Sequence, residues 1–144
     1  MKASHILASK PHCLFNKQLK SMGSEVRSRF NVACFTEVPL TQLHRLVGEI
    51  PGRQIRLEPY GFVFTKDVIV AAGGQPAIYV NSYGGNTWLR QGVDELFNLA
   101  CLPDGRLQTS LWRIIPFINA MHEQYDFSWE REWRVHGGFK FIRR

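Results

Sequence analysis

Apolar and polar residues alternate most clearly near the end of the chain, over residues 127–135. In a β-strand, this run puts its aromatic and branched residues on one face, with Arg131 among them: Phe127, Trp129, Trp133 and Val135. The other face carries Ser128, Glu130, Glu132 and Arg134. A helix also remains open, because Trp129 and Trp133 are spaced i,i+4. The aromatic and β-branched residues, and the glycines that follow at 137 and 138, favour the strand.

The same patterning predicts a series of short elements along the rest of the chain. We expect strands near His5 and at 30–36, 60–66, 77–80 and 139–142. We expect helices at 13–22, 41–47, 89–101 and 107–123, and one helical turn from Asp67 to Ala72. Pro116 either kinks the 107–123 helix or starts a second segment. This mixture predicts an α+β fold over residues 1–144, as a single domain with a mixed or mainly antiparallel sheet and two to four helices.

Charge and composition narrow the expected partners and location. The net charge of +6 favours an acidic macromolecule, either a protein or a nucleic-acid-containing complex. The apolar runs are too short to span a membrane, and the N-terminus lacks the apolar core of a signal peptide. Cys13, Cys34 and Cys101 are too widely spaced for a zinc motif. We therefore expect a cytoplasmic protein without a metal or a membrane partner.

Two carboxylates on one strand face suggest chemistry. If Glu130 and Glu132 lie side by side, their repulsion raises the pKa of one of them, which suits acid–base work. The alternative is a core strand whose charges pair with one another, for instance with Arg134 holding both carboxylates ionised. The pattern leaves both interpretations open.

Three segments together resemble a known family. They are Cys34–Leu40 (CFTEVPL), Tyr60–Lys66 (YGFVFTK) followed by Gly73–Tyr79 (GGQPAIY), and Trp129–Arg134 (WEREWR). In order and approximate spacing the set resembles the AbiGi-type abortive phage infection family. A looser similarity links the chain to DarT-like ADP-ribosyltransferases. The resemblance implies an intracellular protein of phage–host conflict.

The resemblance to ADP-ribosyltransferases implies a fold of that kind, with NAD as the substrate. Glu132 would stabilise the cation that develops at the ribose, and Glu130 would orient or deprotonate the acceptor. The residues implied to hold NAD are His5, Tyr60, Tyr79 and Arg134, with strand packing as the alternative role for both tyrosines.

The other hypothesis is a non-catalytic antitoxin or inhibitor module. Such a module would bind a protein or a protein–nucleic-acid complex of the defence machinery through its basic surface. The residues that matter would then be Arg53, Arg56, Lys66, Arg143 and Arg144.

Overall fold

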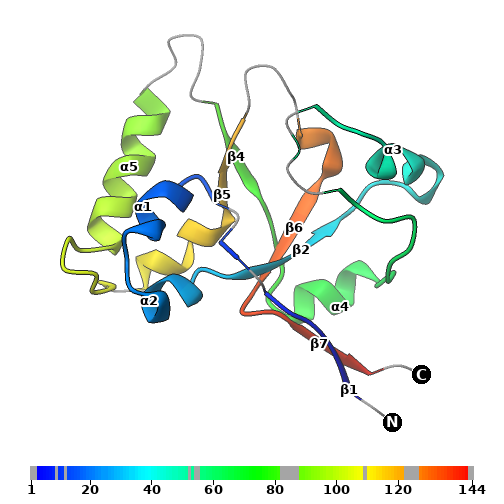
Figure 1. Cartoon of the computed structure of the whole chain (residues 1–144), viewed down its shortest axis with the longest axis horizontal. Helices are drawn as coiled ribbons and strands as arrows, with labels where there is room; N and C mark the ends of the chain where they lie inside the picture. The colour runs from blue at the N-terminus through cyan, green and yellow to red at the C-terminus, as the bar shows by residue number, and fades with distance from the viewer. Residues whose placement is uncertain are drawn as a thin grey trace.

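The computed structural model describes residues 3–8, 10–11, 13–51, 53, 56–81, 88–108, 110–121 and 127–142. Short strands cross its centre, and helices gather at either side (Figure 1). The predicted α+β class is confirmed. Residues 82–87 and the basic residues Arg143 and Arg144 lie outside the described residues.

The central sheet is antiparallel and three-stranded. Its order is β2 (Val32–Thr36), β6 (Glu132–His136) and β3 (Gln75–Pro76). Arg134, in the middle strand, lies opposite Cys34 on one side and Gln75 on the other. The middle strand β6 is therefore hydrogen-bonded to a neighbour on each side, and its side chains alternate between the two faces of the sheet.

Two further strand pairs extend the architecture. Strand β4 (Ile78–Val80) runs parallel to β5 (Ile118–Ala120), and β1 (Ala3–Ile6) pairs antiparallel with β7 (Phe139–Ile142). Only Ala77 separates β3 from β4, and its amide donates a 2.9 Å hydrogen bond to the Glu132 carbonyl. One extended segment, residues 75–80, thus belongs to two sheets.

The helices are mostly short. The α-helices are α1 (Asn16–Lys20), α2 (Ser24–Ser28), α3 (His44–Val47), α4 (Lys66–Ala71) and α5 (Trp88–Ala100). The 3-10 helices are η1 (Leu40–Gln42), η2 (Leu111–Arg113), η3 (Ile115–Phe117) and η4 (Ser128–Glu130). Helix α5 buries Val93, Phe97 and Ala100, whose spacing of four and three residues places them on one face.

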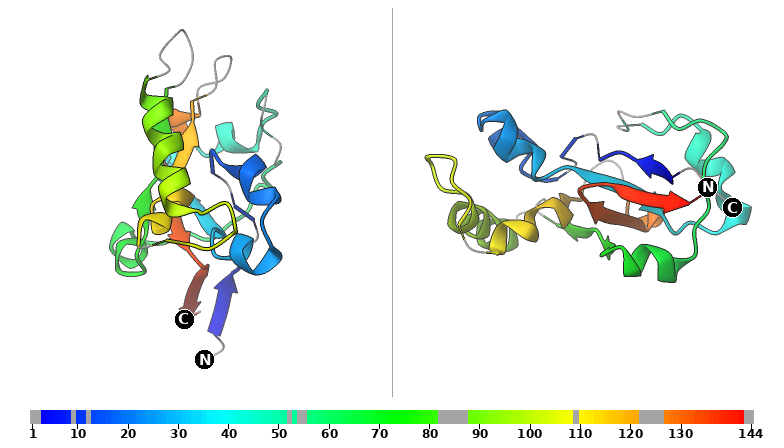
Figure 2. Two further views of the ribbon diagram at one scale, coloured as in Figure 1. Left: turned by 90° about the vertical axis from the view of Figure 1, so that its left-hand side faces the viewer. Right: turned by 90° about the horizontal axis from the view of Figure 1, so that it is seen from below.

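Two apolar clusters hold these elements. The first packs α1 and α5 against β4, β5 and η3, with Phe15 stacked on Phe97 at 4.4 Å between ring centroids. The second lies under β2, β6 and β7, where Phe35, Phe64 and Phe139 meet edge to face. Seen from below, α5 lies at one end of the molecule and α3 at the other, with the strands between them (Figure 2, right).

The strand expected over 127–135 is wrong in its first half. Residues 128–130 form η4, and Arg131 adopts a left-handed backbone conformation with φ 48°. The Thr36 hydroxyl donates to the Glu130 carbonyl, and the Glu37 amide donates to the Arg131 carbonyl at 3.2 Å. These contacts hold the bend, so the strand begins only at Glu132. Trp129 and Trp133 lie in different elements and are half-buried.

The strand expected at 60–66 is also wrong. Residues 60–65 have no strand pairing, and Lys66 already begins α4. Both edges of β6 are taken by β2 and β3, so this segment has no ladder to join there. Phe64 still packs inward against Phe139 and Phe141, which accounts for the apolar pattern.

The helix expected at 107–123 is replaced by η2, η3 and β5. Pro116 has no amide hydrogen and lies in the first turn of η3, so the second of the two expected roles, the start of a new segment, is confirmed. Ile118 instead pairs with Ile78, and its carbonyl accepts a 2.9 Å hydrogen bond from the Leu14 amide. The sequence pattern predicted no helix over 24–29, where the structure has α2.

The remaining elements follow the sequence pattern more closely. Helix α5 and strands β2, β4 and β7 lie within or overlap the predicted ranges, and His5 lies in the short strand β1. The 13–22 helix is shortened to α1, and the 41–47 helix is divided into η1 and α3. The predicted turn of helix after Asp67 starts one residue earlier as α4.

A tight contact behind α4 gives the first testable prediction. A Cβ atom on Gly74 would lie 2.6 Å from the Ile69 carbonyl oxygen and 2.5 Å from its Cγ2. We expect Gly74→Ala to lower the free energy of unfolding by about 1–3 kcal/mol through overpacking. Chemical denaturation measures the change.

Gly92 provides the matched control for this substitution. It lies exposed within α5, and nothing is within 4 Å of its Cβ position. Gly92→Ala should raise stability by about 0.5–1 kcal/mol, because alanine has the higher helix propensity. Equal effects of the two substitutions would contradict the tight contact at Gly74.

Candidate functional site

The fully buried guanidinium of Arg134 is the centre of the candidate site. Its Nε and Nη2 donate to the two carboxylate oxygens of Glu132, both at 2.9 Å. Its Nη1 donates to the Pro116 carbonyl at 2.7 Å. Arg134 therefore ties the central sheet to η3, which belongs to the neighbouring apolar cluster.

Glu132 is held as an ionised carboxylate. The Tyr79 hydroxyl donates to Glu132 Oε2 at 3.0 Å, and the Cys34 thiol also hydrogen-bonds the carboxylate. Burial opposes the charge, but hydrogen bonding and attraction to Arg134 outweigh it and lower the pKa of Glu132. The raised pKa expected for an unpaired carboxylate couple is thus not found at Glu132.

The two groups beside Glu132 are held in their neutral forms. Burial and the negative charge of Glu132 raise the pKa of the Tyr79 hydroxyl. Cys34 keeps access to solvent, but the protein atoms around its thiol and the charge of Glu132 raise its pKa to about 12. Both groups therefore act as hydrogen-bond donors to the carboxylate.

Glu130 belongs to a separate ion pair. It lies in η4, and its carboxylate accepts a hydrogen bond from Arg53 Nη2. Arg53 also donates to the Leu46 carbonyl at 2.5 Å, which anchors the connection after α3. The expected pair of neighbouring carboxylates on one strand face is therefore wrong, because the bend at Arg131 directs each glutamate to its own arginine.

A third set of charged side chains surrounds Trp133, on the other face of β6. Its indole Nε1 donates to Glu37 Oε2 at 2.9 Å, and Lys66 Nζ lies 3.0 Å from Glu37 Oε1. The Lys66 ammonium also lies 4.7 Å from the Trp133 ring centroid, as a cation–π contact. This group of side chains joins β6 to α4 at the surface.

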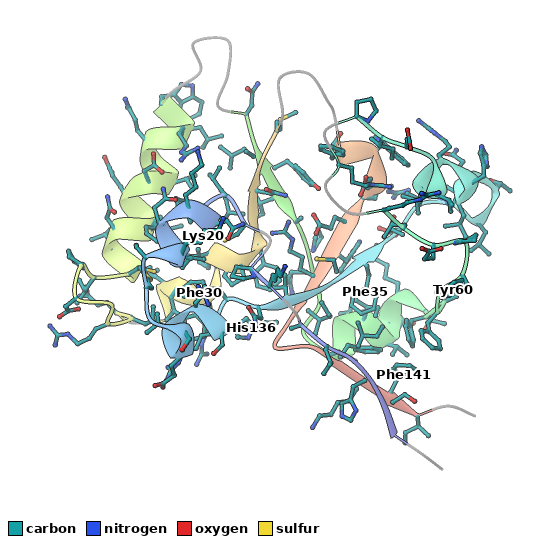
Figure 3. The ribbon with its side chains drawn as sticks, viewed as in Figure 1. Lys20, Phe30, Phe35, Tyr60, His136 and Phe141 are labelled. Carbon is teal, nitrogen blue, oxygen red and sulfur yellow. The ribbon has the colours of Figure 1, made fainter. Side chains whose placement is uncertain are left out.

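Only part of the predicted NAD-binding set is brought together. Tyr79 and Arg134 both contact Glu132, whereas Tyr60 is 82% exposed and projects at the side of the molecule (Figure 3). His5 lies opposite Lys140 in the β1–β7 ribbon, which runs away from β4 and β5 (Figure 1). The described residues therefore form a compact Glu132–Arg134–Tyr79 cluster, and His5 and Tyr60 lie outside it.

Sequence reasoning missed Cys34, the Pro116 carbonyl and the pairing of Arg53 with Glu130. Cys34 joins the cluster through the register of β2 on β6, which residue patterns do not specify. Arg53 lies in a connection without periodicity, so its partner Glu130 follows only from the path of the chain. Alternation along β2 separates the face of Cys34 from the face of Phe35, and this pattern could have indicated which face of the strand meets the cluster.

The cluster favours structural pairing over proton transfer. Both Glu132 oxygens accept hydrogen bonds from Arg134, and one also accepts from Tyr79, so little acceptor capacity remains for a substrate. Within the described ranges, no group of three or more His, Cys, Asp or Glu side chains is arranged to hold a metal ion. The helices of these ranges are all too short or too polar to cross a bilayer.

Comparisons with models of protein families, with characterised proteins and with solved structures find no match to this chain.

Proposed function

We propose that this chain is a non-catalytic module that binds an acidic macromolecule in phage–host conflict. One observation carries the proposal: both candidate catalytic glutamates are already bound within the protein, Glu132 by Arg134 and Glu130 by Arg53. A carboxylate that stabilises a substrate cation needs free lone pairs directed at the reacting atoms. The net charge of +6 supports an acidic partner, and the family resemblance supports the biological setting.

A second candidate is ADP-ribosyl transfer from NAD at Glu132. The observation that favours it is a partly accessible carboxylate, 15% exposed, next to a tyrosine ring. A lowered pKa keeps the charge that such a reaction uses. His5 and Tyr60 would then have no part in holding the nucleotide.

A thermal shift assay with NAD separates the two candidates. A ligand at 100 times its Kd stabilises the native state by about 2.7 kcal/mol. We expect no rise in Tm with NAD, and no release of nicotinamide by the wild-type protein. The partner should co-purify from cells at low salt and dissociate at high salt, and nuclease treatment tells a protein partner from a nucleic-acid complex.

Glu132→Gln provides the decisive variant. In a binding module, it leaves the buried Arg134 without its counter-charge, so the Tm should fall with or without NAD. A rise in wild-type Tm with NAD, together with nicotinamide release that Glu132→Gln abolishes at an unchanged melt, would overturn the proposal and establish the transferase.

A further inference from the structure

A hollow of about 390 Å³ lies beside the segment that joins β3 to β4. Residues 75–78 line it from this segment, and Ile114 and Phe117 line it from the η2–η3 region. Tyr79, the next residue of the segment, instead directs its hydroxyl to Glu132. Neither Tyr79 nor Glu132 nor Arg134 lines the hollow, so it is separate from the charged cluster, although one segment of chain contributes to both.

The lining is unusually apolar for an exposed surface. Ile78 is 51% exposed and Ile114 is 43% exposed, and Pro76 beside them is also open to solvent. Branched aliphatic side chains that gather in a concave surface lose contact with water when a partner fills it. A buried apolar anchor is the usual occupant of such a site.

The charge at the hollow indicates which partner fits. Arg113 is the one charged residue among the described residues that line it. Its guanidinium carbon lies 5.9 Å from the Trp112 ring centroid, where the indole steadies the cation. The described residues of the lining include no acidic side chain, and the chain as a whole is basic. A carboxylate is thus the complementary group at this rim.

We propose that the hollow is the docking site for an acidic protein segment. A leucine, isoleucine or phenylalanine of that segment fills the space between Ile78 and Ile114, and a neighbouring aspartate or glutamate pairs with Arg113. The inference rests on the proposed binding function and names the surface that performs it. An apolar anchor with a flanking acidic residue is a common mode of peptide recognition.

Selection from a displayed random peptide library tests the site. The full-length chain is the target, and binding of each selected peptide is measured by fluorescence anisotropy. We expect the enriched peptides to share an aliphatic or aromatic residue beside Asp or Glu. Ile114→Glu and Arg113→Glu should each weaken binding by about tenfold or more, because one fills the hollow with charge and the other reverses the rim.

Leu99→Glu is the matched control, because Leu99 is 60% exposed on α5 and does not line the hollow. It should leave peptide binding unchanged, and the melt of each variant shows whether it has folded. Peptides without the shared pattern, no enrichment, or equal binding to folded Ile114→Glu would each overturn the site. The site would also be overturned if no peptide is selected and the chain binds a nucleic acid equally well with and without Ile114→Glu. The NAD assay is independent of this result, so the binding function and its docking site fail separately.

Discussion

Arg134→Ala is expected to lower the free energy of unfolding by about 3–5 kcal/mol. The substitution removes the partner of the Glu132 carboxylate, whose side chain is only 15% exposed, and leaves that charge in a poorly solvated position. It also frees the Pro116 carbonyl from its 2.7 Å hydrogen bond. Urea denaturation followed by far-UV circular dichroism measures the loss.

The controls separate a lost pair from a stranded charge. Arg134→Met combined with Glu132→Leu removes both charges, so the double variant should be more stable than Arg134→Ala alone. Arg106→Ala breaks an exposed pair with Asp104 and should leave the denaturation midpoint unchanged. If Arg134→Ala behaves like Arg106→Ala, the buried pair does not stabilise the fold.

Phe15→Ala should lower stability by about 3–5 kcal/mol. The Phe15 ring is fully buried, and it stacks on Phe97 at 4.4 Å, so its loss leaves a cavity between α1 and α5. Helices α1 and α5 hold the side chains around the ring in place, so we expect the cavity to close only partly. The same denaturation experiment measures this change.

Tyr60→Ala is the matched aromatic control for the cavity. Tyr60 is 82% exposed, so its truncation should change stability by less than about 0.5 kcal/mol. A Phe15→Ala midpoint close to that of Tyr60→Ala would be inconsistent with a packed first cluster.

Local sequence patterns predicted some elements correctly and failed for others, although the patterns themselves were of the same kind. Helix α5 follows from its apolar stripe, and β2 from a short apolar run. The segment at 60–65 has the same kind of pattern, but the neighbouring edges of β6 are occupied, so it stays unpaired. Strand formation depends on a partner elsewhere in the chain, and residue patterns do not identify that partner.

The candidate site was predicted in part for the same reason. Glu132, Arg134 and Tyr79 do meet, because the first two share a strand face and β4 continues from a neighbour of that strand. Glu130 lies outside this cluster because the backbone turns at Arg131. That residue has a left-handed conformation, which non-glycine residues adopt only rarely. His5 and Tyr60 were assigned from resemblance, and their elements follow separate paths.

The shared segment at residues 75–80 has a consequence for how the molecule responds to a partner. Its first residues are bonded to the β6 ladder and its last residues to β5, so opening one ladder pulls on the other. Amide protons along it should therefore exchange with solvent in a common opening event, rather than strand by strand. A partner that stiffens the outer surface of this segment should slow that opening. Amide exchange would then slow in both ladders, even if the partner contacts neither apolar cluster.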